Sequence, residues 1–369
     1  MSNRSADALF QLVKSLEKSE KRNFKLFVKR NSSSDNLKTI QLFDALDKMT
    51  DYDEKALLKK NKGIKKKQLS NIKASLYRTI LSSLRLIRDE DNIDIRLHEQ
   101  MDYARILYNK GLYMQSLKQL ERMKEMAKSH HQLTYMQQAL FFEKKIEALY
   151  ITHSMQDRAD QLSAESDAVN HELSLVNQLS NLSLQLYGWY IKHGHARNEK
   201  DLSDIHSFFE KHMPSGAYQG EGFYEKLYLY QSYCWYATIR QDFLQYYRYS
   251  KKWVGLFHEY TEVLTIETAA YIKGMNNLMN ANFYLLNQRK LHDVIKDFEQ
   301  FAHTKLVEQN ENNRILTYVY LYTARINLYF LRGTFTKGLR LVPFLEEMLK
   351  KYGIYLDEHR VLVFYYKIA

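Results

Sequence analysis

The chain has 369 residues, of which 45% are hydrophobic, so it can bury a sizeable core. Its 2 prolines and 12 glycines are too few for the frequent turns of a β-sandwich or a doubly wound sheet, but they suffice for long helices joined by short turns. The single cysteine, Cys234, excludes an intramolecular disulfide and a thiolate metal cluster. There is no signal-like N-terminus and no apolar stretch long enough for a membrane helix. We therefore expect a cytoplasmic all-α protein without membrane association.

The positive charge is concentrated at the beginning of the chain. Residues 1–88 contain 21 basic and 9 acidic side chains, an excess that accounts for the whole net charge of +11. The charge pattern predicts two parts, a basic helical N-terminal region at 1–90 and a second region at 91–369.

Apolar residues recur at helical spacing throughout the first region. They predict a helix over 6–30, a shorter one over 37–49, a third that ends at residue 60, and a long one over 65–88. Polar segments at 31–36 and 61–63 separate them. The first region is thus expected to be a small helical head.

From residue 95 onward the pattern suggests pairs of helices joined by tight turns. The clearest unit spans 101–128, with small, apolar, glycine and aromatic residues at regular offsets: Ala104, Leu107, Gly111, Tyr113, Ser116, Leu120 and Met123. The small residues would let paired helices approach closely, the glycine would form the turn, and the aromatic would wedge between the helices. A weaker copy places Arg289 where the turn glycine would be.

These offsets resemble the tetratricopeptide repeat (TPR) signature. The resemblance implies an α-α superhelix, a TPR-like right-handed solenoid with a concave groove, built from about six long hairpins at 95–129, 132–172, 173–213, 221–259, 263–303 and 311–351. Between Tyr113 and Phe335 lie 222 residues, which over five repeats gives about 44 each, longer than the standard repeat of roughly 34. The chain is also similar to helical repeat proteins of unknown function that are frequent in Bacteroidetes.

The last predicted helix, over 357–369, is strongly apolar and aromatic. A terminal repeat usually presents a polar outer face. We therefore expect the array to be truncated here, to continue beyond this helix, or to be covered by another subunit.

Residue patterns typical of catalysis are missing from the sequence. It has no HExxH, no glycine-rich phosphate loop and no Gly-x-Ser-x-Gly. Cys234 lies within an apolar helical stretch and is interpreted as a packed thiol. The histidine pairs His130–His131 and His193–His195 match no metal-binding spacing and are interpreted as turn residues. The sequence predicts neither an enzyme nor a cofactor or metal site. An enzymatic hypothesis stays open only if the structure holds a cleft with paired titratable groups.

The resemblance implies that the first helix of each hairpin lines the groove. The implied peptide-binding residues are Arg105, Tyr108, Asn109, Lys144, Gln231, Trp235, Asn287 and Asn327. The Lys/Asn clamp that some members use for a peptide carboxylate is not supported, because Met101 and Arg105 stand at two of its positions. The 29 tyrosines and 18 phenylalanines have two interpretations, as wedges between long helices or as the lining of such a groove.

A cluster of lysines could contact phosphates or an acidic partner. Its members are Lys59, Lys60, Lys62, Lys65, Lys66 and Lys67. Side chains suited to reading bases are sparse there, with Gln68 and Asn71 the only candidates, and lysine-rich turns are commonly just solvated. The best hypothesis is a protein- or peptide-binding scaffold that uses the concave face. The alternative is a TPR-type regulator whose basic N-terminal helices bind nucleic acid.

Overall fold

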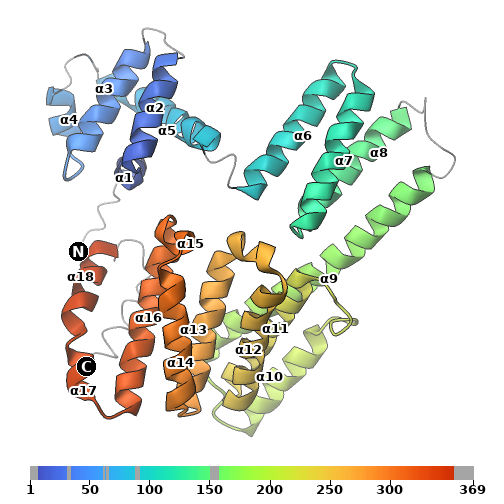
Figure 1. Ribbon diagram of the computed structural model, residues 1–369, viewed down its shortest axis with the longest axis vertical. Coiled ribbons are helices and arrows are strands. Elements are labelled where there is room, and N and C mark those ends of the chain that lie inside the picture. The colour runs from blue at the N-terminus through green and yellow to red at the C-terminus, as the bar shows by residue number, and fades with distance from the viewer. Residues whose placement is uncertain are drawn as a thin grey trace. The chain divides into compact units, whose positions relative to one another are not determined.

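A computed structural model describes residues 7–30, 35–60, 63, 66–87, 92–149 and 158–352, and within these ranges the chain forms helices joined by turns, with no strand (Figure 1). The predicted all-α class is confirmed. The chain divides into two compact units, residues 1–103 and 104–369. The division at residue 90 expected from the charge pattern stays a prediction. No described helix is both long enough and apolar enough to span a lipid bilayer.

Five helices build most of the first unit: α1 (Ala8–Ser15), α2 (Lys18–Arg30), α3 (Asp35–Lys48), α4 (Glu54–Lys60) and α5 (Lys66–Ile87). The single helix predicted over 6–30 is wrong, because Leu16 is extended (φ −69°, ψ 136°) and separates α1 from α2. A carboxylate oxygen of Glu20 accepts a hydrogen bond from the Glu17 backbone N–H (2.9 Å), which caps the start of α2. The helix is therefore interrupted at a polar cap, although the spacing of the apolar residues predicts a continuous helix.

The core of the first unit is apolar and is assembled from the faces that the sequence predicts. Phe24 and Phe43 are fully buried with their rings 4.6 Å apart, and Leu76 and Ile80 of α5 pack into the same cluster. At its edge the ammonium of Lys73 pairs with the carboxylate of Asp7. Lys21 and Lys25 pair in the same way with carboxylates of α3. Three basic side chains of the first unit therefore have ion-pair partners within that unit.

Helix α6 (Ile93–Asn109) leads into the second unit, whose helices are α7 (Tyr113–Ser129), α8 (Leu133–Leu149), α9 (Arg158–His193), α10 (Glu199–His212), α11 (Phe223–Ile239), α12 (Phe243–Glu259), α13 (Thr268–Tyr284), α14 (Gln288–Ala302), α15 (Lys305–Glu308), α16 (Glu311–Leu331), α17 (Phe335–Leu339) and α18 (Val342–Tyr352). A 3₁₀ turn, η1 (Thr261–Thr265), follows α12. The predicted hairpins at 221–259 and 263–303 correspond to α11–α12 and α13–α14 and are confirmed as helix pairs. The predicted final helix at 357–369 lies outside the described residues.

Three predicted hairpins, at 132–172, 173–213 and 311–351, differ from the structure. Helix α9 has 36 residues and runs without a break through the expected boundary at 172–173. It contains no proline, and buried leucines continue at helical spacing through its C-terminal half, so no signal ends it there. In the last hairpin the second helix is split into α17 and α18. Pro343 has no N–H for the carbonyl of Leu339, so a continuous helix would lose that bond.

Five turns of the second unit share one backbone geometry. In each, one residue adopts a left-handed φ of 56° to 76°, and the following N–H bonds to the carbonyl five residues earlier at 2.7–3.0 Å. The left-handed residues are Gly111, His131, Gln241, Leu286 and Gly333. Gly111 is therefore confirmed as a turn residue. The placement of Arg289 at a turn is wrong, because Leu286 occupies it and Arg289 lies within α14.

Helices α6 and α7, which contain the clearest sequence repeat at 101–128, pack closely through the small residues predicted to allow it. Ser116 and Ala104 are fully buried, and the Ser116 hydroxyl donates to the Ala104 carbonyl at 2.7 Å. Leu120 and Met123 are fully buried on the same side of α7. The small side chains thus let α6 and α7 approach until a side chain of one bonds the backbone of the other.

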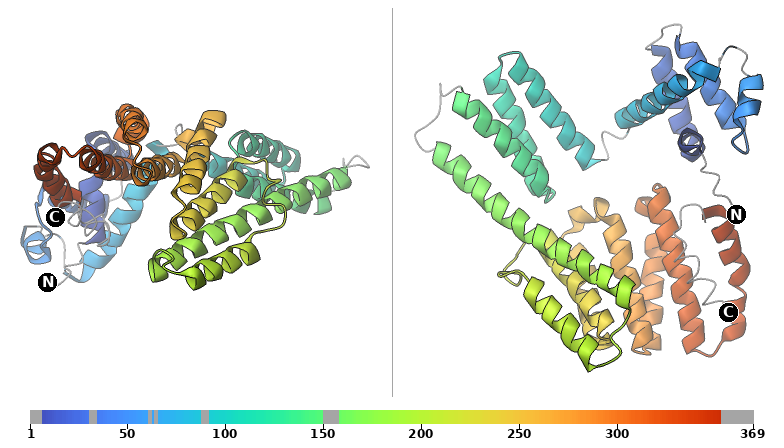
Figure 2. Two further views of the ribbon diagram at one scale, coloured as in Figure 1. Left: turned by 90° about the horizontal axis from the view of Figure 1, so that it is seen from below. Right: turned by 180° about the vertical axis from the view of Figure 1, so that it is seen from behind.

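The largest apolar cluster of the second unit lies among α11, α12, α13, α14 and α16 around the indole of Trp253, which is 1% exposed. A Cβ added at Gly274 would meet that indole at 3.1 Å, so glycine favours the close approach of α13 to the indole. A second cluster joins the C-terminal half of α9 to α10 and α11, which lie side by side (Figure 2). Helix α9 therefore carries side chains to both the interior and the surface of this unit.

Candidate functional site

Two of the predicted groove residues come together with aromatic side chains that were not predicted. Gln231 and Trp235 lie one turn apart on α11, and the rings of Tyr187 and Tyr190 on α9 lie 4.9 and 5.5 Å from Trp235. The exposed ammonium of Lys273, on α13, lies 5.9 Å from the Trp235 ring. We name these five residues the Trp235 patch. Tyr187 is 42% exposed, so the patch reaches the surface.

Three other predicted residues lie on α6. Arg105 and Asn109 are exposed, whereas Tyr108 is half-buried. The ring of Tyr108 contacts those of Tyr113 (5.7 Å) and Phe142 (5.4 Å), so it contributes to packing between the helices. The fourth residue of this part, Lys144, is half-buried on α8.

The two predicted asparagines lie at a helix cap and in the interior of a helix packing face, respectively. Asn287 precedes α14, and its side chain accepts from the Lys290 backbone N–H at 3.2 Å, which caps the helix. Asn327 is 5% exposed within α16. Their role in peptide binding stays a prediction.

The lysine cluster is described only in part. Lys59, Lys66 and Lys67 are exposed, and Lys60 is the last residue of α4. Lys62 and Lys65 lie outside the described residues. The nucleic-acid alternative therefore stays a prediction.

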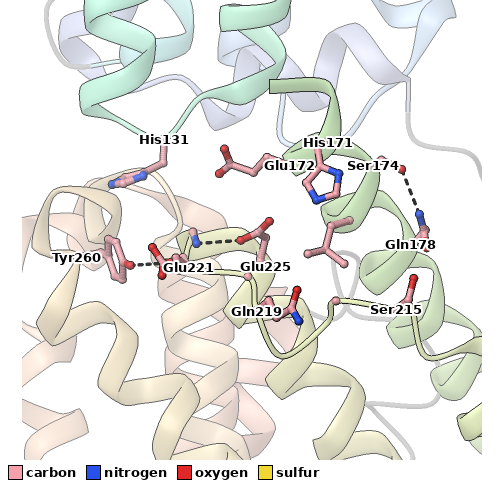
Figure 3. A pocket seen from close by; sticks show the side chains of 14 residues that line it. His131, His171, Glu172, Ser174, Gln178, Ser215, Gln219, Glu221, Glu225 and Tyr260 are labelled. Atoms are coloured by element: carbon pink, nitrogen blue, oxygen red, sulfur yellow. Dashed lines mark hydrogen bonds between the residues drawn. The ribbon is translucent and has the colours of Figure 1, made fainter. Parts of the chain in front are cut away.

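A cleft of about 960 Å³ opens beside α9, and most of the residues that line it carry polar side chains (Figure 3). Its walls come from four places: the α7–α8 turn, the middle of α9, the loop before α11 together with the start of that helix, and the end of α12. The lining residues are His131, His171, Glu172, Ser174, Leu175, Gln178, Ser215, Gly216, Gln219, Gly220, Glu221, Gly222, Glu225 and Tyr260.

Glycines of the loop before α11 let carboxylates approach its backbone. A Cβ added at Gly220 would lie 2.7 Å from an oxygen of Glu225, and one at Gly222 would lie 2.7 Å from an oxygen of Glu172. The Gly222 N–H donates to Glu225 Oε2 at 2.9 Å, at the N-terminal end of α11. The glycines therefore bring carboxylates from α9 and α11 to the same point on the loop.

The environment of Glu172 disfavours its charge. Burial raises the pKa of its carboxyl group above the ordinary value, the neighbouring charge of Glu225 raises it further, and His131 acts in the opposite direction. Glu225 is itself only 6% exposed. Within the described part of the chain, neither carboxylate forms an ion pair with a lysine or arginine.

His131 and Tyr260 form the opposite wall. The imidazole lies 3.1 Å from a carboxylate oxygen of Glu262 and packs edge-on against the Tyr260 ring at 5.2 Å. The Tyr260 hydroxyl donates to the Glu221 carbonyl at 2.9 Å, and the Lys226 ammonium lies 3.4 Å from that hydroxyl. These contacts fix the aromatic wall to the loop on the other side of the cleft.

The α7–α8 turn that carries His131 is held from below by Tyr224. The Tyr224 hydroxyl donates to Glu267 at 3.0 Å and lies 3.3 Å from the Gln132 side-chain amide. Burial, followed by the charge of Glu267, raises the pKa of this phenol well above its ordinary range. The neutral phenol therefore links α8, α11 and α13 beneath the cleft.

Sequence reasoning missed the cleft. Glu172 and Glu225 are 53 positions apart in the sequence. His131 was interpreted as a turn residue, which it also is. One usable signal was present: Gly216, Gly220 and Gly222 lie within seven residues of a chain otherwise poor in glycine. Such a stretch indicates backbone that other groups approach closely.

The described residues also include possible metal ligands and one thiol. No three of their His, Cys, Asp and Glu side chains are grouped so as to hold a metal ion. Cys234 is buried, as predicted for a packed thiol, with its sulfur 3.6 Å from the Ser250 hydroxyl. Burial raises the pKa of this thiol to about 12.

No protein-family model, curated protein or solved structure matches the chain.

Proposed function

We propose that the chain is a scaffold that binds a protein or peptide segment through a TPR-like arrangement of helix hairpins, with no catalytic step of its own. The observation that supports this proposal best is the Trp235 patch. Its side chains come from α9, α11 and α13, each of which precedes a second helix that turns back on it. A face built from successive first helices is the face that the resemblance to tetratricopeptide repeats implies for ligands.

The chemistry of the patch suits an extended segment with apolar and acidic groups. Indole and phenol rings offer a large contact area with a polar edge, and they are enriched where proteins bind one another. The Lys273 ammonium adds a positive charge beside the Trp235 ring, and the Gln231 side chain, which accepts from Ser183 at 3.5 Å, offers amide donors to a peptide backbone.

The turns support the repeat part of the proposal. The left-handed residues Gln241, Leu286 and Gly333 follow one another at intervals of 45 and 47 residues. These intervals match the period of about 44 residues expected from the sequence, and each such turn lies between the two helices of a pair. A regular interval of this kind is typical of an array whose units each add one strip to a common binding face.

The proposal is tested by selecting peptides on the full chain. A random peptide library is selected on the wild type, and peptide affinities are then measured for Trp235→Ala and Lys273→Ala. We expect each substitution to weaken the selected peptides by about tenfold or more, corresponding to about 1.4 kcal/mol. Lys273 is exposed, so its removal should leave folding intact.

Phe141→Ala is the matched control, because Phe141 is an exposed aromatic (63%) on α8. It should leave the affinities unchanged. Peptides that bind the wild type and both patch variants equally would contradict the proposal, as would a selection that yields no peptide dependent on these side chains.

A further inference from the structure

We propose that the cleft between the α7–α8 turn, α9 and the loop before α11 binds a guanidinium or ammonium group. The group can belong to a basic side chain of a peptide or to a small amine, which share this chemistry. The inference does not rest on the peptide-binding role of the Trp235 patch, because the cleft uses other residues.

The carboxylates of the cleft have no lysine or arginine partner among the described residues. The Glu225 side chain is only 6% exposed. Within the described chain its carboxylate accepts one hydrogen bond, from the Gly222 N–H to Oε2. Glu172 lies close to the same glycine and has no such donor among the described residues. Buried charges in proteins are normally paired, because an unpaired buried charge is costly.

The same chain shows how it treats a buried carboxylate that has only a structural role. Glu143 is 3% exposed and is paired with both Lys124 (2.9 Å) and Arg158. The carboxylates of the cleft differ from Glu143 in having open space beside them in place of a cation. A ligand cation would supply in the cleft what Lys124 and Arg158 supply to Glu143.

Acidic side chains outnumber basic ones in the lining of the cleft. The lining carries three carboxylates, Glu172, Glu221 and Glu225, against two imidazoles and no lysine or arginine. His131 is already engaged by Glu262. The nearest ammonium on the aromatic wall, that of Lys226, lies against the Tyr260 hydroxyl. This lining attracts a cation and repels an anion.

The cleft offers several hydrogen-bond acceptors to a cationic donor. A guanidinium presents five N–H donors and an ammonium presents three, and both bond most strongly to carboxylates. Gln178, Gln219, Ser174 and Ser215 add neutral oxygens around the two carboxylates. In Figure 3 the carboxylates of Glu172 and Glu225 both extend into the open space between α9 and the loop. A planar, multivalent donor fits this arrangement better than a bare metal ion, for which the described residues offer no group of three ligands.

The energetics agree with a binding role. Burial, and after it the neighbouring charge of Glu225, raises the pKa of Glu172, so the charged form of this carboxyl group costs stability. Groups that are kept in such unfavourable positions are concentrated at functional sites. A bound cation would turn the repulsion between the two carboxylates into attraction toward a common partner.

The experiment is calorimetric titration of the full chain at neutral pH with two probes. Agmatine represents a small amine, and N-acetyl-Gly-Arg-Gly-amide represents a basic side chain in a peptide. The peptide with citrulline in place of arginine is the neutral control, since it has the same shape without the charge. We expect at least one charged probe to bind, the citrulline peptide to bind at least about tenfold more weakly, and the tighter of the two charged probes to identify the source.

Glu172→Gln and Glu225→Gln should each weaken the tighter probe by about tenfold or more. Both keep a side-chain oxygen, so Glu225→Gln can still accept from the Gly222 N–H, and the melting temperature reports whether each variant folds. Glu210→Gln, an exposed residue on α10, makes the same change of charge outside the cleft and should bind as the wild type does. Absence of binding by both charged probes, or wild-type affinity in folded Glu172→Gln, would overturn the proposal.

Discussion

The ammonium of Lys124 lies 2.9 Å from a carboxylate oxygen of Glu143, and the two side chains are only 4% and 3% exposed where α7, α8 and α9 meet. Glu121 and Glu165 also lie within 3.2 Å of this ammonium, and Arg158 pairs with the second oxygen of Glu143. Burial alone would lower the pKa of Lys124, but the bond and the charge of Glu143 outweigh it, so that the pKa is raised.

Removing either member of this pair takes from the other a partner that is equally buried. We expect Lys124→Met and Glu143→Leu each to lower the free energy of unfolding by about 3–5 kcal/mol, as measured by urea denaturation. The double variant should lose clearly less than the sum of the two, because it removes both buried charges together. Losses that simply add would show that the pair is not coupled. Lys118→Met, an exposed lysine on α7, is the control.

The left-handed turn residues lead to a second prediction. A side chain with a Cβ at such a φ costs about 1–2 kcal/mol, and Leu286 is 73% exposed, so little packing is lost with it. Leu286→Gly should therefore raise the free energy of unfolding by about 0.5–1 kcal/mol, measured by thermal or urea denaturation. Leu286→Ala keeps the Cβ and should not raise the free energy of unfolding. The comparison separates the cost of the left-handed backbone from the effect of losing the leucine side chain. Gly111→Ala is the reverse test and should destabilise, because it introduces a Cβ at φ 76°.

These turns also show how far the sequence alone could lead. Gly111 was identifiable because glycine favours the left-handed region, whereas Gln241 and Leu286 carry no such signal and take that conformation because the packing of the flanking helices requires it. The helix faces were predictable from apolar spacing. The length of α9 was not, since no cap or proline marks either the continuation or the break.

The same distinction applies to the sites. Gln231 and Trp235 could be identified from their position on the first helix of a hairpin. Glu172 and Glu225 could not, because their proximity depends on how α9 passes the loop before α11, a contact between segments that have no regular spacing in the sequence. Long-range contacts of this kind are outside the reach of local periodicity.

A third prediction concerns Cys234. Its thiol is buried and its pKa is raised to about 12, so the reactive thiolate is scarce at neutral pH and the sulfur is covered. We expect a disulfide reagent to modify the native protein at least about a thousandfold more slowly than the urea-unfolded protein. The reaction followed against urea concentration should track unfolding. Rapid, complete modification in the absence of urea would contradict the buried position of this side chain.

Tyrosine ionisation gives a fourth prediction. Burial raises the pKa of Tyr224, Tyr233 and Tyr246 above the ordinary value of about 10, so these phenols stay neutral in the folded state when unfolded chains would ionise them. Their contribution to stability is fully present below about pH 10 and is lost as the pH rises toward their folded pKa values. In an alkaline spectrophotometric titration, exposed tyrosines should therefore ionise first, and a second group should ionise together with unfolding. Tyr224→Phe should reduce the amplitude of the second phase only.

The last prediction follows from the raised pKa of Glu172. A carboxyl group whose pKa is higher in the folded state binds protons more readily there, so its charge destabilises the fold at pH values above the folded pKa. The penalty disappears below the ordinary value of about 4.3, where the group is protonated in both states. Glu172→Gln removes the charge and should raise the melting temperature by roughly 1–2 °C at neutral pH, with a difference that shrinks toward zero as the pH falls to about 4.

Glu210→Gln should show no such pH-dependent difference, because Glu210 is an exposed residue outside the cleft. A charged probe that binds the cleft should raise the melting temperature of the wild type while leaving that of Glu172→Gln nearly unchanged. The variant would then be more stable than the wild type without ligand and would gain less from it. A Glu172→Gln protein that is less stable than the wild type at neutral pH would show that the carboxylate has a stabilising partner, and would remove the electrostatic reason for expecting a cation there.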